Sequence, residues 1–295
     1  MKKLQSIAIF GRMCDEKYVP HIQTMFDTFS EAGVQIFVYS AFREFLKNKI
    51  TLPTVGIFQR SSELIGMVDA FVSIGGDGTI LDSATLVKES LIPIIGINTG
   101  RVGFLSTLQM EDLSNYMPSI LAGDFEVDSR DMIQLETKQR LFGDTNYALN
   151  EMVVHKKDTS SMISIHTYLN DEYMCTYWAD GLIISTPTGS TAYSLSCGGP
   201  IVLPDANTII INPIAPHNLN SRPMVISNNK TIKLKIEGRS KYFLASLDSR
   251  QETIDSNVEM LIRKCDFPMN FVRLKEHSFL RTINKKLHWG YDQRN

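Results

Sequence analysis

The sequence lacks the features of a membrane protein or a nucleic-acid-binding protein. No apolar run approaches the roughly 20 residues that span a bilayer, and the apolar stretch at 7–10 is too short for the core of a signal peptide. The 30 Lys and Arg residues are balanced by 32 Asp and Glu residues, which leaves a formal net charge of −2. Such a charge gives no general attraction for nucleic acid or for an anionic membrane. We therefore expect a cytoplasmic protein with neither as a partner.

The sequence also lacks paired cysteines. Cys14, Cys175, Cys197 and Cys265 are scattered singly, without the spacing of a structural zinc site or a redox motif. The six histidines are equally dispersed. We interpret the cysteines as buried thiols and expect no metal ligands in the chain itself. A metal would arrive with a substrate, as Mg²⁺ does with a nucleotide.

What is present includes a glycine turn, Gly75-Gly76-Asp77-Gly78-Thr79, directly after the apolar run at 70–74. Its glycines let the backbone approach a phosphate, and a helix expected from Thr79 to about residue 88 would aim its first amides at the same anion. A carboxylate repels phosphate, so Asp77 is useful there only if it binds a metal or accepts a proton from an attacking hydroxyl. The pattern favours a phosphoryl-transfer site over an ordinary turn of Gly and Asp.

Two common nucleotide fingerprints do not fit the chain. The P-loop pattern, which ends in Gly-Lys-Ser/Thr, does not occur. The dinucleotide fingerprint fails at the glycine turn because Leu81 stands where close helix packing needs glycine. A second glycine-rich segment, residues 96–103, has the wrong spacing. Hydride transfer is therefore disfavoured.

The first 125 residues or so alternate between strand and helix patterns. Strands are expected at 7–10, 34–39, 70–74 and 92–98. Ile22, Met25, Phe26 and Phe29 form a helical stripe, and residues 113–121 form another before Gly123. This order predicts a parallel sheet covered by helices, with ligands at the carboxyl ends of its strands.

Beyond about residue 125 the chain changes to short β-type runs separated by turn residues such as Asn170-Asp171 and Asn228-Asn229. The length fits two domains. We predict an α/β plus all-β protein, with a Rossmann-like parallel-sheet domain over 1–125 and a β-rich domain over 126–267. The tail, 268–295, would pack back on the first domain. The expected β runs are 132–135, 152–155, 164–169, 174–178, 182–185, 208–212, 231–236 and 243–247.

The densest polar run lies in the β-rich half. Residues 185–196 hold seven Ser and Thr residues among small ones, which would give a surface able to hydrogen-bond a ribose and phosphates without charge. Long ordered loops are usually functional, although a plain loop of turn formers fits the same residues. Asn150-Glu151 adds an amide and a carboxylate, but such a pair is common on protein surfaces.

Several segments together resemble the NAD kinase family. The glycine turn at 75–79 is similar to its GGDG motif, and residues 96–105 to the glycine-rich segment that follows it. Asn150-Glu151 resembles its short NE motif. Residues 180–202 match its longest signature nearly residue for residue, and residues 216–223 resemble a further segment. The motifs occur in order from about residue 70 to the C-terminus.

The resemblance implies transfer of the γ-phosphate of ATP to the 2′-hydroxyl of the adenosine ribose of NAD, giving NADP, with Mg²⁺ or another divalent metal accompanying ATP. It implies an active site in the cleft between the two domains and a homodimer or homotetramer. Asp77 would accept the proton, and Gly75, Gly76, Gly78 and Thr79 would form the phosphate loop. The residues implied to bind NAD are Asp77, Gly78, Asn150, Glu151, Asp180, Thr191, Ala192, Tyr193, Ser194, Leu195 and Ser196.

The chain departs from the family pattern at Asp82, Ser161, Trp178 and Arg250, to which we assign no contact. Arg250 replaces an amide. Its guanidinium either reaches the new 2′-phosphate, or faces solvent or pairs with a carboxylate such as Glu252.

Two other functions remain open from the residues alone. One is a GGDG-type kinase for a lipid or sugar phosphate, and the other a sensor that binds NAD or NADP without chemistry. The sequence does not distinguish NAD from NADH, or ATP from polyphosphate; the resemblance points to NAD and ATP.

Overall fold

A computed structural model describes residues 3–157, 161–276 and 278–288. The chain folds into two compact units, residues 1–129 with 269–295, and residues 130–268. Of the predicted tail, 268–295, residues 277 and 289–295 lie outside the described residues. We describe each unit by itself.

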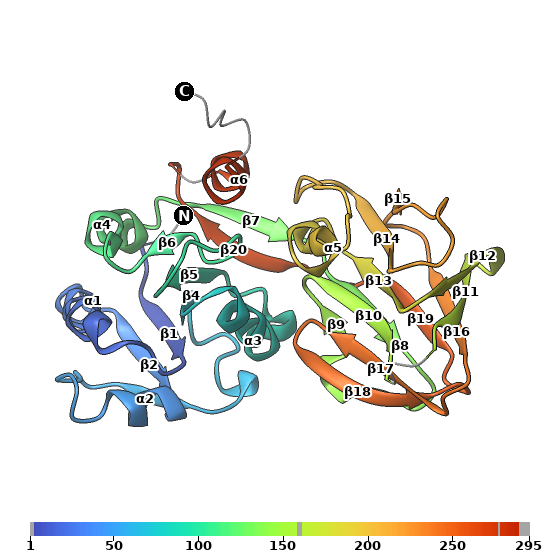
Figure 1. Cartoon of the computed structure of the whole chain (residues 1–295). Helices are drawn as coiled ribbons and strands as arrows, with labels where there is room; N and C mark the ends of the chain where they lie inside the picture. The colour runs from blue at the N-terminus through green and yellow to red at the C-terminus, as the bar shows by residue number, and fades with distance from the viewer. Residues whose placement is uncertain (1–2, 158–160, 277, 289–295) are drawn as a thin grey trace. The chain divides into compact units, whose positions relative to one another are not determined.

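The first unit is built on an eight-stranded sheet in the order β3-β2-β1-β4-β5-β20-β7, with β6 beside β5 (Figure 1). The pairs from β3 to β20, and the pair of β5 with β6, are parallel. This confirms the parallel sheet predicted from the alternating strand and helix patterns. The strands are β1 Ser6–Gly11, β2 Gln35–Tyr39, β3 Gly56–Phe58, β4 Ala70–Ile74, β5 Ile94–Asn98, β6 Leu108–Gln109, β7 Glu126–Arg130 and β20 Met269–Arg273.

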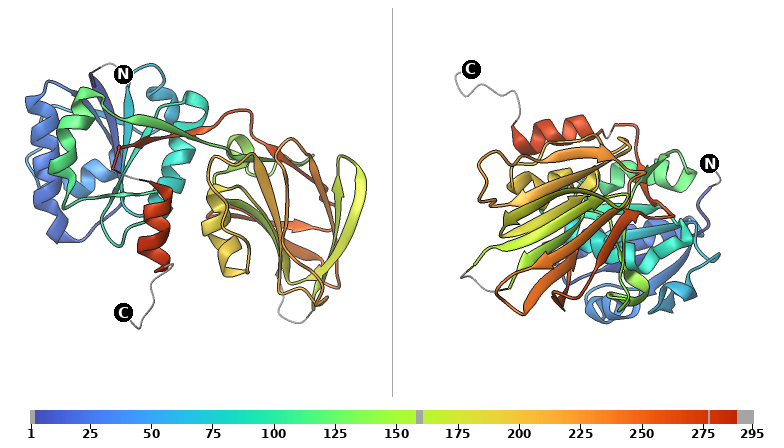
Figure 2. Two further views of the ribbon diagram at one scale, coloured as in Figure 1. Left: turned by 90° about the horizontal axis from the view of Figure 1, so that it is seen from above. Right: turned by 90° about the vertical axis from the view of Figure 1, so that its right-hand side faces the viewer.

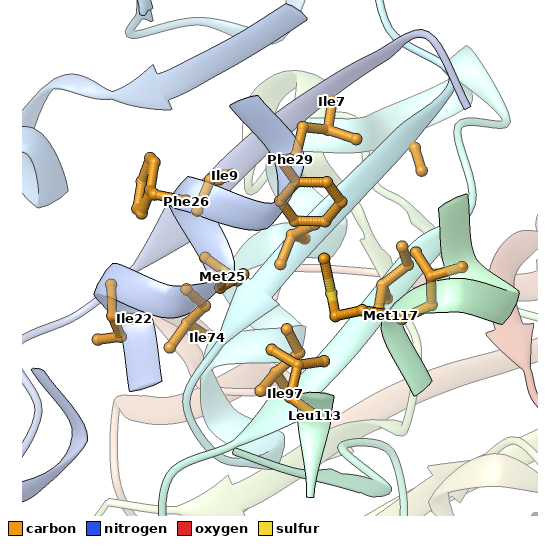
Figure 3. Close-up of a cluster of buried hydrophobic side chains, with 14 of the residues drawn as sticks. Ile7, Ile9, Ile22, Met25, Phe26, Phe29, Ile74, Ile97, Leu113 and Met117 are labelled. Atoms are coloured by element: carbon orange, nitrogen blue, oxygen red, sulfur yellow. The ribbon is translucent and has the colours of Figure 1, made fainter. Parts of the chain in front are cut away.

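One face of this sheet packs against helices α1 (Val19–Glu31) and α4 (Leu113–Ala122). The four stripe residues of α1 are all buried, together with Ile7 and Ile9 of β1 (Figure 3). The 3.6-residue period therefore marks the packed face of the helix, as predicted. Gly123, in the left-handed conformation, ends α4 where the sequence placed its end.

Helix α3 (Asp77–Val87) covers the opposite face of the sheet, as Figure 2 shows. Ser83 of α3 donates to the hydroxyl of Ser73 on β4 at 2.8 Å, and Ser73 points away from the face of its neighbours Val72 and Ile74. The helix begins two residues before the predicted start at Thr79, because Gly76 is already extended and takes the N-cap position. Asp77 is thus the first residue of the helix.

The second unit holds two six-stranded sheets whose described pairs are all antiparallel. Alternate residues of the strands point into a shared apolar core, as Ile232, Leu234 and Ile236 of β16 do. The predicted β-rich half is confirmed. The first sheet contains β15 Met224–Ser227, β14 Thr208–Ile214, β13 Gly181–Ser185, β10 Glu151–Lys156, β17 Tyr242–Leu247 and β18 Arg250–Asp255. The second contains β12 Glu172–Ala179, β11 Ile163–Leu169, β16 Ile232–Glu237, β19 Met260–Lys264, β8 Ile133–Glu136 and β9 Tyr147–Ala148.

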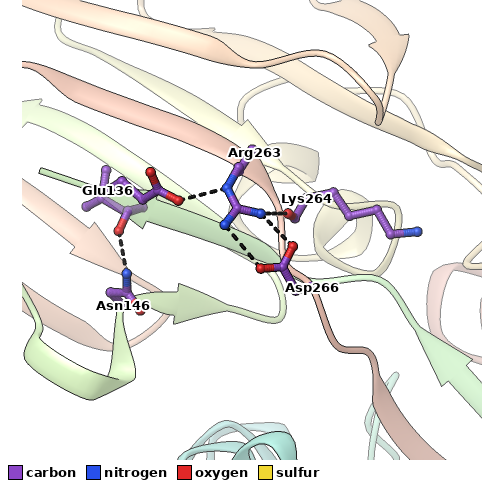
Figure 4. Close-up of polar contacts among 6 residues, drawn as sticks. Glu136, Asn146, Arg263, Lys264 and Asp266 are labelled. Atoms are coloured by element: carbon purple, nitrogen blue, oxygen red, sulfur yellow. Dashed lines mark hydrogen bonds and ion pairs between the residues drawn. The ribbon is translucent and has the colours of Figure 1, made fainter.

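Arg263 ties β19 to β8 within the second sheet (Figure 4). Its Nε donates to Glu136 at 2.7 Å, and its two terminal nitrogens donate to Asp266 at 2.7 and 3.2 Å. The two carboxylates raise the pKa of Arg263, and the guanidinium lowers the pKa of Asp266. The groups are partly open to solvent, so their main effect is on geometry.

Some elements were not predicted from the sequence. Helix α2 (Ser40–Leu46) and the short strands β3, β6 and β9 carry too few residues to show a period. After β20 the chain forms helix α6 (Phe279–Leu287). None of the described helices is both long and apolar enough to span a membrane.

Candidate active site

The carboxylate of Asp77 lies at the carboxyl end of β4 and accepts three backbone hydrogen bonds. Phe104 donates to Oδ2 at 2.8 Å, while Leu105 and Ser106 donate to Oδ1 at 3.1 and 3.0 Å. These donors fix the rotamer of the side chain and offset its charge. The sequence placed Asp77 in the glycine turn but gave no sign that a segment 27 to 29 residues further on would hold it.

That segment, residues 98–106, is itself held by Asn98, the last residue of β5. The buried side chain of Asn98 accepts from Gly100 at 2.7 Å and donates to the carbonyls of Arg101 and Ser106 at 2.9 and 3.3 Å. Ser106 in turn donates its hydroxyl to the carbonyl of Gly75 at 3.1 Å. The glycine turn and the second glycine-rich segment thus form one hydrogen-bonded cluster.

The N-terminus of α3 keeps backbone donors available. The amides of Asp77 and Gly78 take part in no hydrogen bond among the described residues, as is usual for the first turn of a helix. Of the predicted phosphate loop, Gly75 donates to Ile97 at 2.8 Å and Thr79 to Gly76 at 2.9 Å, so their amides are engaged. The free amides of the first turn can bind an anion.

A cavity of about 460 Å³ adjoins this helix at the carboxyl ends of β1 and β2. The strand order reverses between β1 and β4, and in open parallel sheets ligands bind at such a switch point. The ion pair of Arg12 with Asp82 lies at this cavity. The lining is mostly apolar, with Phe10, Gly11, Arg12, Met13, Tyr39, Ala41, Phe42, Phe45, Asp82, Thr85 and Leu86.

In the second unit, Asn150 and Glu151 are buried at the start of β10, not exposed as such a pair commonly is. Asp248 accepts from the amides of Leu149, Asn150 and Glu151 at 2.9, 2.8 and 3.2 Å. Burial raises the pKa of Asp248. This carboxyl therefore sets the backbone of the predicted NE motif.

Burial and the neighbouring charge of Asp248 raise the pKa of Glu151 to about 8. A hydrogen bond from the backbone amide of Tyr193 opposes this shift. Oε2 of Glu151 is buried and has no hydrogen-bond partner among the described residues. A neutral Glu151 can donate a hydrogen bond as well as accept one. Burial and Cys197, with smaller contributions from the charges of Asp180 and Glu151, raise the pKa of Tyr193, which agrees with a common neighbourhood for these predicted residues.

Asp180, between β12 and β13, pairs with Lys156, whose Nζ lies 2.5 Å from Oδ1 of Asp180. Both side chains are less than a third exposed. The backbone adds a second link, because Lys156 donates its amide to the carbonyl of Asp180 at 2.9 Å. Lys156 was not singled out from the sequence, since a lysine at a strand end is common on surfaces.

The expectation of a hydroxyl-lined surface at 185–196 is wrong for five of the seven Ser and Thr side chains. Ser185, Thr186, Thr188, Ser190 and Ser194 are buried. They bond to their own surroundings: Thr186 donates to Leu149 at 2.6 Å, and Asn212 donates to Ser194 at 3.2 Å. A hydroxyl can satisfy a buried backbone group as readily as a ligand, and the residue pattern does not separate the two uses.

The segment is also helical rather than a loop, with a 3₁₀ turn at Thr188–Thr191 and helix α5 at Tyr193–Ser196. Of the predicted NAD contacts here, Ser194 is fully buried. Thr191, Ala192, Tyr193, Leu195 and Ser196 remain at least partly exposed.

The four residues that depart from the family pattern have structural surroundings of their own. Arg250 donates to the carbonyls of Thr145 and Tyr147, which differs from each contact weighed from the sequence. Trp178 lies against His217, with ring centroids 5.0 Å apart. Asp82 pairs with Arg12, and Ser161 is half-buried.

Comparison with known proteins agrees over nearly the whole chain. Residues 44–125 match the family model described as the ATP-NAD kinase N-terminal domain, and residues 149–274 match the ATP-NAD kinase C-terminal domain. An NAD kinase of Cytophaga hutchinsonii is 43% identical over 98% of this chain and 99% of its own. An NAD kinase of Flavobacterium psychrophilum is 44% identical over the same shares.

Two solved structures are similar in fold. A yeast NADH kinase complexed with NADH has a TM-score of 0.87 at 23% identity, covering 99% of this chain and 90% of that chain. An Archaeoglobus fulgidus NAD kinase in complex with ATP has a TM-score of 0.75 at 26% identity, covering 96% and 99%. With both family models matched and relatives above 40% identity along its length, this chain belongs to the NAD kinase family of phosphotransferases.

Proposed function

We propose that this protein transfers the γ-phosphate of ATP to the 2′-hydroxyl of the adenosine ribose of NAD, with Asp77 as the proton acceptor. Besides family membership, the observation that supports this assignment is the placement of Asp77, at the first turn of α3 and at the carboxyl end of β4. The bond between the γ-phosphorus and its bridging oxygen breaks and a bond to the ribose oxygen forms. The hydroxyl proton passes to Asp77, and ADP leaves.

The contacts of Asp77 indicate which of its oxygens takes the proton. A carboxylate has about four acceptor positions, two on each oxygen. Leu105 and Ser106 occupy those of Oδ1, and Phe104 occupies one on Oδ2. The remaining position lies on Oδ2, so we assign proton acceptance to that atom. Three donors on a single carboxylate also hold it ready for an incoming hydroxyl, which is the main contribution a protein makes to phosphoryl transfer.

The phosphate donor fits the first unit. Its triphosphate would meet the free amides of Asp77 and Gly78 at the start of α3. Its base would enter the adjoining cavity, whose aromatic lining includes Phe10, Tyr39 and Phe42. The glycines of the turn leave room for this approach, since a Cβ on Gly76 or Gly78 would meet nothing within 4 Å.

The acceptor NAD would be bound by residues of the second unit, chiefly Asn150, Glu151, Asp180 and the exposed residues of 191–196. Glu151 in its neutral form offers a hydrogen-bond donor to NAD, while Asp180, paired with Lys156, offers an acceptor. Ser194, buried and bonded to Asn212, would act by shaping α5.

Divalent metal enters this proposal as part of the substrate. Among the described residues no three His, Cys, Asp or Glu side chains are grouped so as to hold a metal ion, and Mg²⁺ is typically carried by nucleotide phosphates with few protein ligands. On the family resemblance we further propose a cytoplasmic homodimer or homotetramer, to be tested by light scattering of the purified protein.

The decisive experiment is to incubate the pure protein with Mg-ATP and NAD and to measure NADP with an NADP-specific dehydrogenase. We expect NADP to form with ATP and NAD. Parallel reactions replace NAD with NADH and ATP with polyphosphate, and faster turnover of NADH than of NAD would contradict the proposed acceptor. Tight binding of NAD without any NADP formed would favour a sensor, and phosphorylation of a lipid or sugar phosphate but not NAD would favour the other kinase class.

A further inference from the structure

Phe104 contacts two parts of the first unit at once. Its amide donates to Oδ2 of Asp77 at 2.8 Å, and its half-buried ring lies against the C-terminal helix α6. The ring centroid of Phe279 is 6.3 Å from that of Phe104, and Nζ of Lys286 lies 4.4 Å from the Phe104 centroid. Phe279 and Lys286 are seven residues apart, which is two helical turns, so both lie on one face of α6.

We propose that α6 is a positioning element for catalysis, and that Phe279 and Lys286 hold the Phe104 amide against Oδ2 of Asp77. The inference rests on the proposed role of Asp77. The proposal gives a role in catalysis to α6, which lies more than 170 residues further along the chain than Phe104.

The segment that carries Phe104 needs such support. Gly100 and Gly103 precede it, and glycine leaves a backbone free to take other conformations. Asn98 fixes the segment at Gly100, Arg101 and Ser106, and the amide of Gly103 donates to the carbonyl of Ser106 at 3.1 Å. The Phe104 ring, in contrast, meets Phe279 and Lys286. An aromatic pair and a cation over a ring are both attractive contacts, and together they bias a flexible peptide toward one position.

The consequence concerns the one oxygen with an open acceptor position. If the Phe104 amide drifts, Oδ2 loses its backbone donor, and the carboxylate is held only at Oδ1, by Leu105 and Ser106. Misplacement by about 1 Å at a reacting group can cost up to about 100-fold in rate. Substrate affinity should change little, since neither Phe279 nor Lys286 is among the proposed substrate contacts.

The test compares Phe279→Ala and Lys286→Met with Leu280→Ala as the matched control. Leu280 is the neighbour of Phe279 on α6 and is 61% exposed. We expect kcat to fall about tenfold or more in the first two variants, with KM for NAD and ATP within twofold of wild type. Leu280→Ala should keep the wild-type kcat. Phe279→Tyr, which keeps the ring, should restore most of the rate.

Hydrogen exchange measured by mass spectrometry gives a readout that does not need activity. The amides of residues 104–106 should exchange about tenfold faster in Phe279→Ala than in Leu280→Ala. Unchanged exchange, or a kcat equal to that of Leu280→Ala, would overturn the inference. The inference would also be overturned if kcat fell and both KM values rose by the same factor, because that pattern indicates general damage to the protein. If Phe279→Ala does not fold, Phe279→Leu keeps the apolar volume without the ring, and the same outcomes apply.

The two hypotheses fail differently. A wild-type protein that makes no NADP contradicts the proposed function, while the exchange measurement still tests the contact between α6 and Phe104. If the wild type is active but the Phe279 variants behave like Leu280→Ala, the proposed function stands and only the role of α6 is contradicted.

Discussion

A β carbon on Gly103 would lie 1.8 Å from Oδ1 of Asp77, far inside van der Waals contact. The carboxylate therefore fills the space that any other residue at 103 would need. Gly103→Ala should displace Asp77 or the segment that holds it, and we expect kcat to fall at least about tenfold. Gly100→Ala is the control in the same segment, since its β carbon would meet its nearest neighbour, Asn98 Oδ1, at 3.6 Å. Steady-state kinetics of the two variants should differ clearly, and equal rates would contradict the geometry.

Asp77→Asn should lower kcat by at least roughly 100-fold, because the amide cannot accept the proton. Affinity for NAD should be nearly retained, as for an interaction used in the transition state. The structure adds that the NH₂ group of Asn cannot accept from a backbone amide, so either Phe104 or the pair Leu105 and Ser106 loses its acceptor. Single-turnover rates and calorimetric NAD binding check both parts. A variant with wild-type turnover would remove the catalytic assignment.

Glu151 should make stability fall as pH rises. In the unfolded chain a glutamic acid ionises near pH 4.3, whereas burial and the charge of Asp248 raise the pKa of Glu151 in the folded protein to about 8. Between these values the folded state holds a proton that the unfolded state has released, so the free energy of unfolding decreases toward pH 8. The Gln side chain of Glu151→Gln carries no such proton. Over this pH range, the free energy of unfolding should therefore fall by roughly 3–5 kcal/mol less in the variant than in the wild type.

Urea unfolding at pH 5 and pH 8 measures this difference. Glu172→Gln, at an exposed glutamate of β12, is the control and should follow the wild type. A pH dependence identical in wild type and Glu151→Gln would show that Glu151 is ionised throughout.

Arg250→Gln should affect stability rather than product affinity. The guanidinium donates to the carbonyls of Thr145 and Tyr147 and lies 5.8 Å from the centroid of the Tyr147 ring. Loss of these bonds should lower the free energy of unfolding by about 1.5–3 kcal/mol. The ratio of NADP to NAD affinity, measured by calorimetry, should not change. Tenfold weaker NADP binding with unchanged NAD binding would instead support a contact to the 2′-phosphate.

The cavity beside α3 should control use of the phosphate donor. Ala41→Trp places a large side chain in its lining and should raise KM for ATP about tenfold or more while leaving KM for NAD within twofold. Ser256→Trp, at an exposed residue of the other unit, is the control. Equal changes in both KM values would argue that the base of ATP binds elsewhere.

Much of the fold could be predicted because its signals are local. The apolar run at 70–74 became β4 with the same bounds, and the stripe from Ile22 to Phe29 became the buried face of α1. The Asn170-Asp171 turn has positive φ at both residues, as a tight hairpin requires. These features depend on residues close together in sequence, where period and turn chemistry are informative.

The candidate site was less predictable because its contacts are distant in sequence. Asp77 is held by amides of residues 104–106, and backbone amides carry no residue-type signal. Asp248 sets the backbone of Asn150 and Glu151 from almost 100 residues away. The hydroxyls of 185–194 could not be divided into buried and exposed ones until the packing of β13 and α5 was known.

The sheet of the first unit includes β20, whose Phe271 pairs with Ile94 of β5. That strand is encoded after the whole of the second unit, residues 130–268. A ribosome therefore synthesises the complete β-rich unit before the last strand of the first sheet. Domains generally fold as units during synthesis, but β5 has only β6 beside it, at Ile97 and Asn98, and lacks its pairing with β20 at Ile94 until some 140 further residues are made. The first unit can therefore complete its sheet only after the whole of the second unit has been made.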